Sequence, residues 1–212
     1  MPIPFKTDVI VAAPTRDLTT LDSVKEELGI TTNDDDAWLV DKIHRASDVI
    51  AKACKRQFQQ ETLADHFFID WCERTGPLIL SRIPVVSVDS IVENNAVITA
   101  SSYNVDLVAG RVWRNVANSF SSWNWLTGEV VVQFVGGYEL LPTLPYDLEQ
   151  ACLLLIKQSW FAKTRDPLVR SVSIPGVASY DYWVGSNAEH RGGGFPPEVA
   201  QLIAPYVMNV AL

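Results

Sequence analysis

The histidines of this chain are the first candidates for acid–base chemistry, because histidine titrates near neutral pH. His44 lies in a helical pattern outside its apolar stripe, His66 borders an aromatic stretch, and His190 lies in a glycine-rich loop. Neither His66 nor His190 has a partner at the spacing of a metal site. A small hydrolase, the enzymatic alternative, would have to combine His66 with Ser87 or Cys72 from distant segments, and no G-x-S-x-G motif supports it. The sequence therefore predicts no catalytic, metal or cofactor site.

Two other patterns resemble ion-binding sites only in part. Asp34, Asp35 and Asp36 suggest calcium, but the later ligands of an EF-hand loop are missing. We expect instead that their negative charges stabilise the following helix by interacting with the positive end of its dipole. The glycines at 192–194 are followed by Phe195 and two prolines rather than by the Lys-Ser or Lys-Thr of a phosphate loop. We therefore predict a hinge at these glycines.

The three cysteines, Cys54, Cys72 and Cys152, are far apart and form no C-x-x-C pair. Their spacing indicates neither a zinc site nor a redox motif. Cys54 and Cys152 fall within helical apolar patterns, so we predict that both are buried thiols. Such a chain suits a reducing compartment.

The composition indicates a globular protein without a general affinity for DNA. Of the 212 residues, 48% are hydrophobic and 20% charged, which is enough for a real core. The net charge of −8 argues against binding DNA by charge attraction, although it suits a protein that lets DNA pass. The N-terminus lacks the pattern of a signal peptide, and no segment approaches the ~20 apolar residues of a membrane span.

Periodicity divides the chain into helical ends and a β-rich middle. Thr20 is placed to cap a first helix and Gly29 to end it, because glycine tolerates positive φ. We therefore predict an α+β protein, mainly α, with a helical bundle and an inserted small antiparallel β unit. The predicted boundaries are an extended arm over 1–19, a core over 20–164 with helices at 20–29, 34–58 and 145–164 and a β unit at 61–138, a flexible loop or hinge over 165–195, and a C-terminal helix over 196–212.

Three groups of apolar residues are candidates for contacts with other proteins, since tryptophan and tyrosine are enriched at interfaces. Two groups are candidates for contact with a neighbouring subunit or another protein: Phe120, Trp123, Trp125, Tyr180, Tyr182 and Trp183. The third lies in the nearly uncharged C-terminal segment: Phe195, Val199, Leu202, Ile203, Tyr206, Val207, Met208 and Leu212. The alternatives are that the tryptophans pack inward on the β unit and that the last helix packs on its own bundle.

Six short motifs occur in order over roughly residues 19–208. They are Thr20, Leu21, Lys25 and Leu28; Leu80 to Val88 (LSRIPVVSV); Tyr103, Asp106, Gly110 and Val112; Val130, Val132, Phe134, Gly137 and Tyr138; Pro145, Asp147, Leu148 and Ala151; and Pro196, Val199, Leu202 and Tyr206. Each is weak alone, but the ordered set resembles the head–tail connector (adaptor, or head-completion) proteins of tailed bacteriophages. The chain departs from the pattern in its additional aromatics at 112–125 and in an apolar rather than basic end at 207–212.

The resemblance implies a structural protein of the virion neck, made in the host cytoplasm, without catalysis or cofactor. Such proteins form homo-oligomeric rings, commonly dodecamers, below the portal protein, where they extend the DNA channel and provide the docking surface for a stopper or tail. It implies that the C-terminal segment binds the portal, and we expect the two aromatic groups to contact the tail or a neighbouring subunit. We further hypothesise that Asp34, Asp35 and Asp36 face the lumen, past which DNA slides without sequence-specific binding. The alternative within this class is a tail-completion or stopper protein, expected to be a smaller β-barrel without the long helical hairpin.

Overall fold

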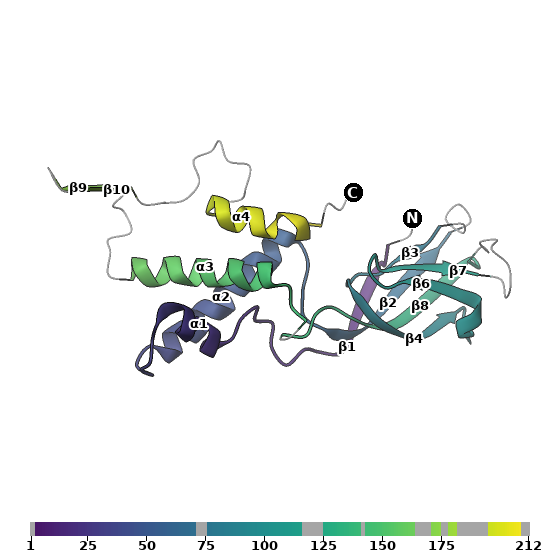
Figure 1. Ribbon diagram of the computed structural model, residues 1–212. Helices are drawn as coiled ribbons and strands as arrows, with labels where there is room; N and C mark the ends of the chain where they lie inside the picture. Colours follow the sequence, from purple (N-terminus) through teal and green to yellow (C-terminus); the bar gives the residue numbers. More distant parts are fainter. Residues whose placement is uncertain are drawn as a thin grey trace. The chain divides into compact units, whose positions relative to one another are not determined.

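The computed structural model describes residues 3–70, 76–115, 125–140, 143–163, 171–174, 178–181 and 195–208. The chain forms two compact units, each assembled from separate segments (Figure 1). Unit 1 comprises Met1–Thr15 and Gln57–Glu139, and unit 2 comprises Arg16–Arg56 and Leu140–Leu212.

Unit 1 is built on an antiparallel five-stranded sheet in the order β1-β2-β8-β4-β5. Its strands are β1 (Lys6–Val11), β2 (Glu61–Ile69), β8 (Gly128–Gly136), β4 (Val85–Glu93) and β5 (Ala96–Val97). The pairing of β2 with β8 runs along their whole length, from Glu61 opposite Gly136 to Ile69 opposite Gly128. Because successive side chains in a strand point to opposite faces, the alternate burial along β2 assigns Leu63 and Phe67 to the core.

A second, three-stranded sheet covers this core in the order β3-β7-β6. It consists of β3 (Leu78–Ile79), β7 (Arg111–Arg114) and β6 (Tyr103–Asp106), preceded by the 3₁₀ turn η1 (Ala100–Ser102). Side chains from both sheets form one apolar cluster: Leu63, Phe67, Ile69, Leu78, Leu80, Val85, Ile91, Ile98, Val112, Trp125, Val130, Val132 and Phe134. Unit 1 is therefore a two-layer β structure.

A glycine closes unit 1 where β8 ends. The backbone N–H of Tyr138 donates to the carbonyl of Phe58 at 2.7 Å, which brings two chain segments close together. Gly137 has φ of +106°, and a Cβ there would lie 2.3 Å from the Gln59 carbonyl oxygen. Only glycine permits both that backbone conformation and that approach.

Unit 2 is helical, with α1 (Leu21–Leu28), α2 (Asp36–Cys54), α3 (Tyr146–Ala162), α4 (Pro197–Ile203) and the 3₁₀ turn η2 (Ala204–Tyr206). The predicted caps of α1 are confirmed: Thr20 Oγ1 accepts from the N–H of Ser23, and Gly29 adopts φ of +67°. The buried stripe of α2 follows the predicted helical spacing through Leu39, Ile43 and Ile50. None of the helices in the described ranges has the length and apolar character needed to span a membrane.

The predicted fold class, a mainly helical bundle with a small β insert, is wrong. Strands occupy as much of the described chain as helices do, and the sheets form a unit with its own core. The error arose because the N-terminal segment was predicted to be an extended arm, whereas β1 pairs with β2. The middle of the chain was predicted to be a small β unit of short strands, whereas β2, β4 and β8 have nine residues each and pair with strands distant in sequence.

Two local differences from the predicted elements have simple causes. Helix α2 ends at Cys54, because Lys55 adopts a left-handed conformation with φ of 54°, and the buried Phe58 belongs to unit 1. In the segment predicted as a loop, β9 (Ser171–Ile174) and β10 (Ala178–Asp181) pair as an antiparallel hairpin.

Candidate assembly surfaces

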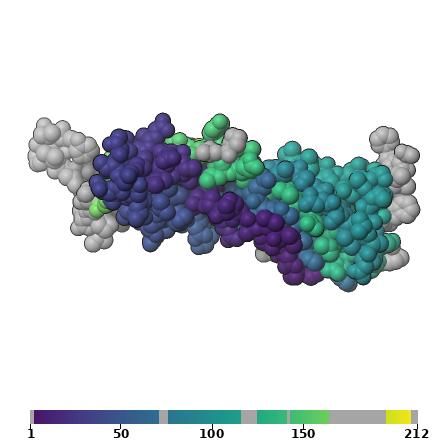
Figure 2. All heavy atoms as spheres, turned by 90° about the horizontal axis from the view of Figure 1, so that it is seen from below, coloured from purple at the N-terminus to yellow at the C-terminus, as the bar shows by residue number. Residues whose placement is uncertain are grey.

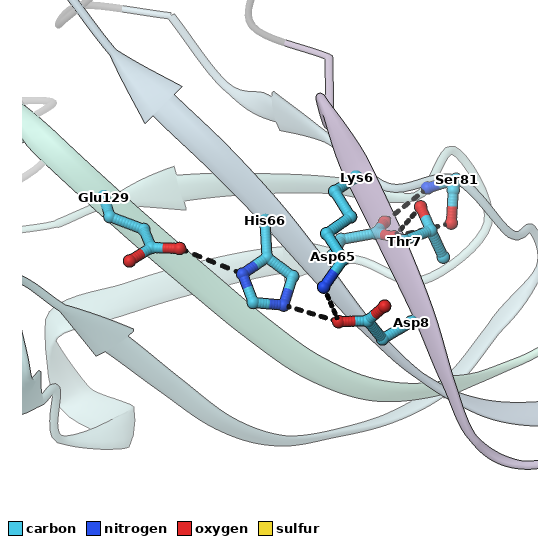
Figure 3. A network of polar contacts seen from close by, with 7 residues as sticks. All are labelled: Lys6, Thr7, Asp8, Asp65, His66, Ser81 and Glu129. Atoms are coloured by element: carbon cyan, nitrogen blue, oxygen red, sulfur yellow. Dashed lines mark hydrogen bonds and ion pairs between the residues drawn. The ribbon is translucent and has the colours of Figure 1, made fainter.

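A buried carboxylate connects strand β1 to the rest of unit 1 through hydrogen bonds (Figure 3). Asp65 of β2 is fully buried and accepts three hydrogen bonds, from Thr7 Oγ1 at 2.6 Å and from the N–H and Oγ of Ser81, both at 2.7 Å. Burial raises the pKa of Asp65, and the hydrogen bonds from Thr7 and Ser81 oppose that shift. One side chain therefore joins β1, β2 and the loop after β3.

The other face of the same strand pair carries an exposed ionic cluster (Figure 3). His66 Nδ1 lies 3.0 Å from Glu129 Oε1, and its Nε2 lies 3.3 Å from Asp8 Oδ2. Lys6 Nζ donates to Asp8 at 2.6 Å, and chiefly this hydrogen bond lowers the pKa of Asp8. His66 therefore bridges carboxylates on β1 and β8, on the opposite face from Asp65.

A buried ion pair lies at the start of β2. Arg82 Nη2 donates to Glu61 Oε2 at 2.9 Å, and Arg82 Nη1 donates to the Gln59 carbonyl at 2.8 Å. Sequence analysis identified neither this pair nor Asp65. For Asp65 a signal was available, because a charged residue occupies a core-facing position between Leu63 and Phe67 of the alternating strand.

In unit 2, two of the three aspartates predicted to face a lumen are paired with lysines. Asp36 accepts from Lys25 at 2.9 Å, and Asp35 pairs with Lys163, while Asp34 is exposed. The Lys163 ammonium also lies 5.0 Å from the ring centre of Trp160, and the Trp160 ring makes an edge-to-face contact with Trp38 of α2. The acidic turn thus connects the start of α2 to the end of α3.

The C-terminal segment packs on its own unit, the alternative that the sequence left open. Val199 is fully buried, Ile203 is 4% exposed, and the Met208 N–H donates to the carbonyl of Cys54 at 3.0 Å. Helix α4 ends at Ile203 rather than continuing to the chain end. The remaining residues predicted to contact the portal are partly exposed: Phe195, Leu202, Tyr206, Val207 and Met208. Leu212 lies outside the described residues.

The predicted aromatic interface is described only in part. Trp125 is fully buried in the core of unit 1, and its indole N–H donates to the Gly76 carbonyl at 3.1 Å. It therefore packs inward and offers no docking surface. Tyr180 belongs to β10. The others fall outside the described residues: Phe120, Trp123, Tyr182 and Trp183.

A shallow groove of about 220 Å³ runs between α2 and α3. Ala46, Val49 and Ile156 contribute apolar surface to it, and Lys42 and Arg45 contribute cationic side chains. Arg45 is already paired with Asp41 at 2.9 Å, and Lys42 lies over the Trp38 ring. These cations are therefore engaged within the chain.

Among the described residues, the candidate groups of the hydrolase alternative do not contact one another. His66 contacts carboxylates, the Ser87 hydroxyl donates to Asp89 at 3.2 Å, and Cys72 lies outside the described residues. Cys54 and Cys152 are buried as predicted, and burial raises the pKa of Cys152 to about 12. No group of three histidine, cysteine or acidic side chains in the described ranges could hold a metal ion.

Comparison with solved structures shows where this fold recurs. A chain in the neck of a native gene transfer agent (GTA) particle, computed with C12 symmetry, has 17% identity and a TM-score of 0.59, with 98% of both chains covered. A chain in the neck of an empty GTA particle, computed with C6 symmetry, has 18% identity, a TM-score of 0.60 and the same coverage. A chain from the virion of a native particle has 17% identity and a TM-score of 0.54, with 81% of this chain and 90% of that chain covered.

No curated protein matches this chain in sequence. The model of one protein family does match, over residues 17–207, and its description is head completion protein. That match spans both compact units and nearly the whole range over which the ordered motifs occur. The chain therefore belongs to the head completion protein family.

Proposed function

We propose that this chain is a structural neck protein of a virus-like particle, a head–tail connector that binds below the portal and receives the stopper or tail. The observation that carries the proposal is the family match over residues 17–207. The fold shared with neck chains along 98% of this chain supports it. A structural family and a chain without an assembled set of catalytic groups in its described part favour a non-enzymatic role.

We infer that the chain acts as a ring of twelve copies. The similar neck chains come from reconstructions computed with C12 and with C6 symmetry, and twelve subunits are compatible with both. A ring of this kind needs a heterologous interface, in which one surface of a subunit contacts a different surface of the next. DNA would pass through its centre.

The portal contact is assigned to the partly exposed residues of the C-terminal segment, namely Leu202, Val207 and Met208 with Phe195 and Tyr206. Val199 and Ile203 are excluded because they belong to the core of unit 2. For the same reason deletion of 197–212 would remove core residues and could not separate docking from folding. Single substitutions at exposed positions are therefore the better test.

The proposed lumen surface is the acidic turn formed by Asp34, Asp35 and Asp36. Asp34 is exposed, and the carboxylates of Asp35 and Asp36 are each held by a lysine. Proteins bind DNA when their cationic side chains replace the counterions of the phosphates. A channel surface with few unpaired cationic side chains would not do so, and DNA would slide past it. The net charge of −8 is consistent with that role.

The test is the joining of tails to DNA-filled heads that lack this protein. We expect Leu202→Asp to abolish joining while the variant keeps the unfolding temperature of the unmodified chain. Phe161→Asp, on an exposed side chain of α3, is the matched control and should join tails normally. Normal joining by a folded Leu202→Asp variant would contradict the proposed portal contact.

Cryo-electron microscopy of the completed particles tests the position of the protein. A ring of this chain directly below the portal, with Asp34 lining the channel, is the expected result. Density separated from the portal by another ring would assign the chain to the stopper or tail-completion role instead. A lumen lined by basic residues, with Asp34 outside, would contradict the proposed channel surface.

A further inference from the structure

Strand β1 is an edge strand that leaves backbone groups open for pairing. Within the described residues it is hydrogen-bonded on one side only, to β2. The N-terminal residues, purple in Figure 2, lie at the surface of unit 1. An edge of this kind presents a row of unpaired N–H and C=O groups to any strand that approaches it.

The core-facing side of the sheet extends onto β1, where an apolar side chain is left exposed to solvent. Thr7 lies opposite Asp65 and Val9 opposite Leu63, so these four side chains share the core-facing side. Leu63 and Asp65 are fully buried, yet Val9 is 47% exposed. Phe5 is 63% exposed. Ile10 and Val11 are exposed as well, but a register shift after Val9 places Val11 opposite Thr62, so they belong to the other face of the edge. Soluble proteins blunt such edges with charge, and here Lys6 is already bound to Asp8.

The strand is held in place before any partner arrives. Asp65 accepts from Thr7 on the core side, and His66 contacts Asp8 on the outer side. The Phe5 N–H also donates to the His66 carbonyl at 3.0 Å. Because β1 is already ordered, a second strand that pairs with it meets a smaller entropic cost.

The opposite edge of the same sheet also carries uncovered apolar side chains. Val97 of β5 is 72% exposed, and Val86 of β4 is 50% exposed. The cross-strand register through β8 places Ala96 of β5 on the same face as Val9. The sheet therefore has two different apolar edges, which is what a head-to-tail contact between identical subunits requires.

We propose that the β1 edge of one copy pairs with the β4–β5 edge of the next copy, so that the five-stranded sheet continues from subunit to subunit around the ring. The occupant of the β1 edge is thus a second copy of this chain rather than a tail or portal protein. This inference rests on the ring of the proposed function. It names the surface through which that ring closes.

The test is crosslinking in assembled particles with a short bis-maleimide. The double variant Val9→Cys/Ala96→Cys carries one thiol on each edge, and we expect a ladder of covalent oligomers on a denaturing gel. The single variants Val9→Cys and Ala96→Cys are the controls and should give no ladder. They also measure any background from the native cysteines.

Each other result overturns the inference. Particles that contain the protein but give no ladder exclude edge pairing while leaving the proposed function intact. Dimers from Val9→Cys alone would show a symmetric contact, and an adduct of Val9→Cys with a different protein would identify another occupant. Absence of the protein from the neck would contradict the proposed function itself, and the inference with it.

A second experiment does not depend on crosslinker geometry. Val9→Lys and Val97→Lys should each prevent ring assembly, because either change places a charge in the contact. Mixing the two variants should yield a heterodimer, since each retains the edge that the other lacks. Val108→Lys, at a side chain that is 80% exposed in the turn between β6 and β7, is the matched control and should form rings normally. Normal rings from both edge variants would overturn the proposal.

Discussion

Unit 1 and unit 2 differ in where they place their charged side chains. Unit 1 buries Glu61, Asp65, Arg82 and Glu93 among its strands. In the described part of unit 2, the buried polar residues are the neutral Thr19 and Ser47, and ion pairs such as Lys157 with Glu27 lie at the surface. The β unit therefore combines its apolar core with buried polar contacts between distant segments, whereas the described part of the helical unit packs mainly through apolar side chains.

The difference follows from how each architecture fixes its register. A helix satisfies its own backbone, so α2 and α3 need only complementary apolar faces. A strand depends on its neighbours, and a slip by one residue would exchange its buried and exposed faces. In unit 1, Asp65 and Arg82 each contact groups on other segments that only one register brings together.

The strongest test of this comparison is Arg82→Ala. Removing Arg82 breaks its buried ion pair with Glu61, which is 3% exposed. We expect the free energy of unfolding to fall by about 3–5 kcal/mol, measured by chemical denaturation. The control is Lys157→Ala, which breaks the surface pair with Glu27 and should cost less than about 1 kcal/mol. Equal losses in the two variants would remove the distinction between the units.

Ile203→Ala tests the other side of the comparison. Ile203 is 4% exposed in unit 2, so its truncation removes buried apolar surface and opens a cavity. We expect a loss of about 2–5 kcal/mol in the free energy of unfolding, with faster amide hydrogen exchange in α3 and α4. Leu202→Ala, at the partly exposed neighbour, should cost clearly less. A loss below about 1 kcal/mol at Ile203 would show that α4 contributes little to the core.

The smallest expected effect is that of Asp65→Asn, and its sign depends on pH. Because burial raises the folded-state pKa of Asp65, the stability it contributes is present below its ordinary value and is lost as pH rises through the folded pKa. Asparagine does not titrate and keeps an acceptor oxygen for Ser81, so we expect a change on the order of 1 kcal/mol. Thermal unfolding should favour the variant increasingly as pH rises.

Asp8→Asn is the matched control for that measurement. The pKa of Asp8 is lowered, chiefly by its hydrogen bond from Lys6, so its contribution is present above its ordinary value and is lost as pH falls. The variant should therefore lose stability relative to the unmodified chain at higher pH. The same pH trend in both variants would contradict the opposite environments assigned to the two carboxylates.

Local signals in the sequence predicted the helices well and the β unit poorly. Thr20 and Gly29 act through their immediate neighbours, so their capping roles could be predicted from type and position alone. The pairing of β1 with β2 joins residues more than fifty positions apart, and the prolines near β1 made it look like an arm. The pattern of either segment alone does not show which distant segment it pairs with.

The sequence shows which segments are apolar, but it does not show whether their side chains face the core or a partner protein. An apolar C-terminal segment was recognised, but the sequence could not decide whether Val199 faces its own bundle or a partner. The same ambiguity applied to Trp125, because a tryptophan suits a core as well as an interface. The exposed apolar edge at Val9 was not predicted, since exposure there depends on which strand lies beside it.

The division of unit 2 into two stretches of chain has a consequence for synthesis on the ribosome. Helices α1 and α2 emerge early, but α3 begins about 90 residues after α2 ends, a delay on the order of ten seconds during translation. Strand β1 is made before α1, and the remaining segment of unit 1, Gln57–Glu139, is made in that interval. During this interval the apolar stripe of α2 has no α3 to pack against, so it is either exposed to solvent or bound by a chaperone. Unit 1 therefore folds before unit 2 is complete.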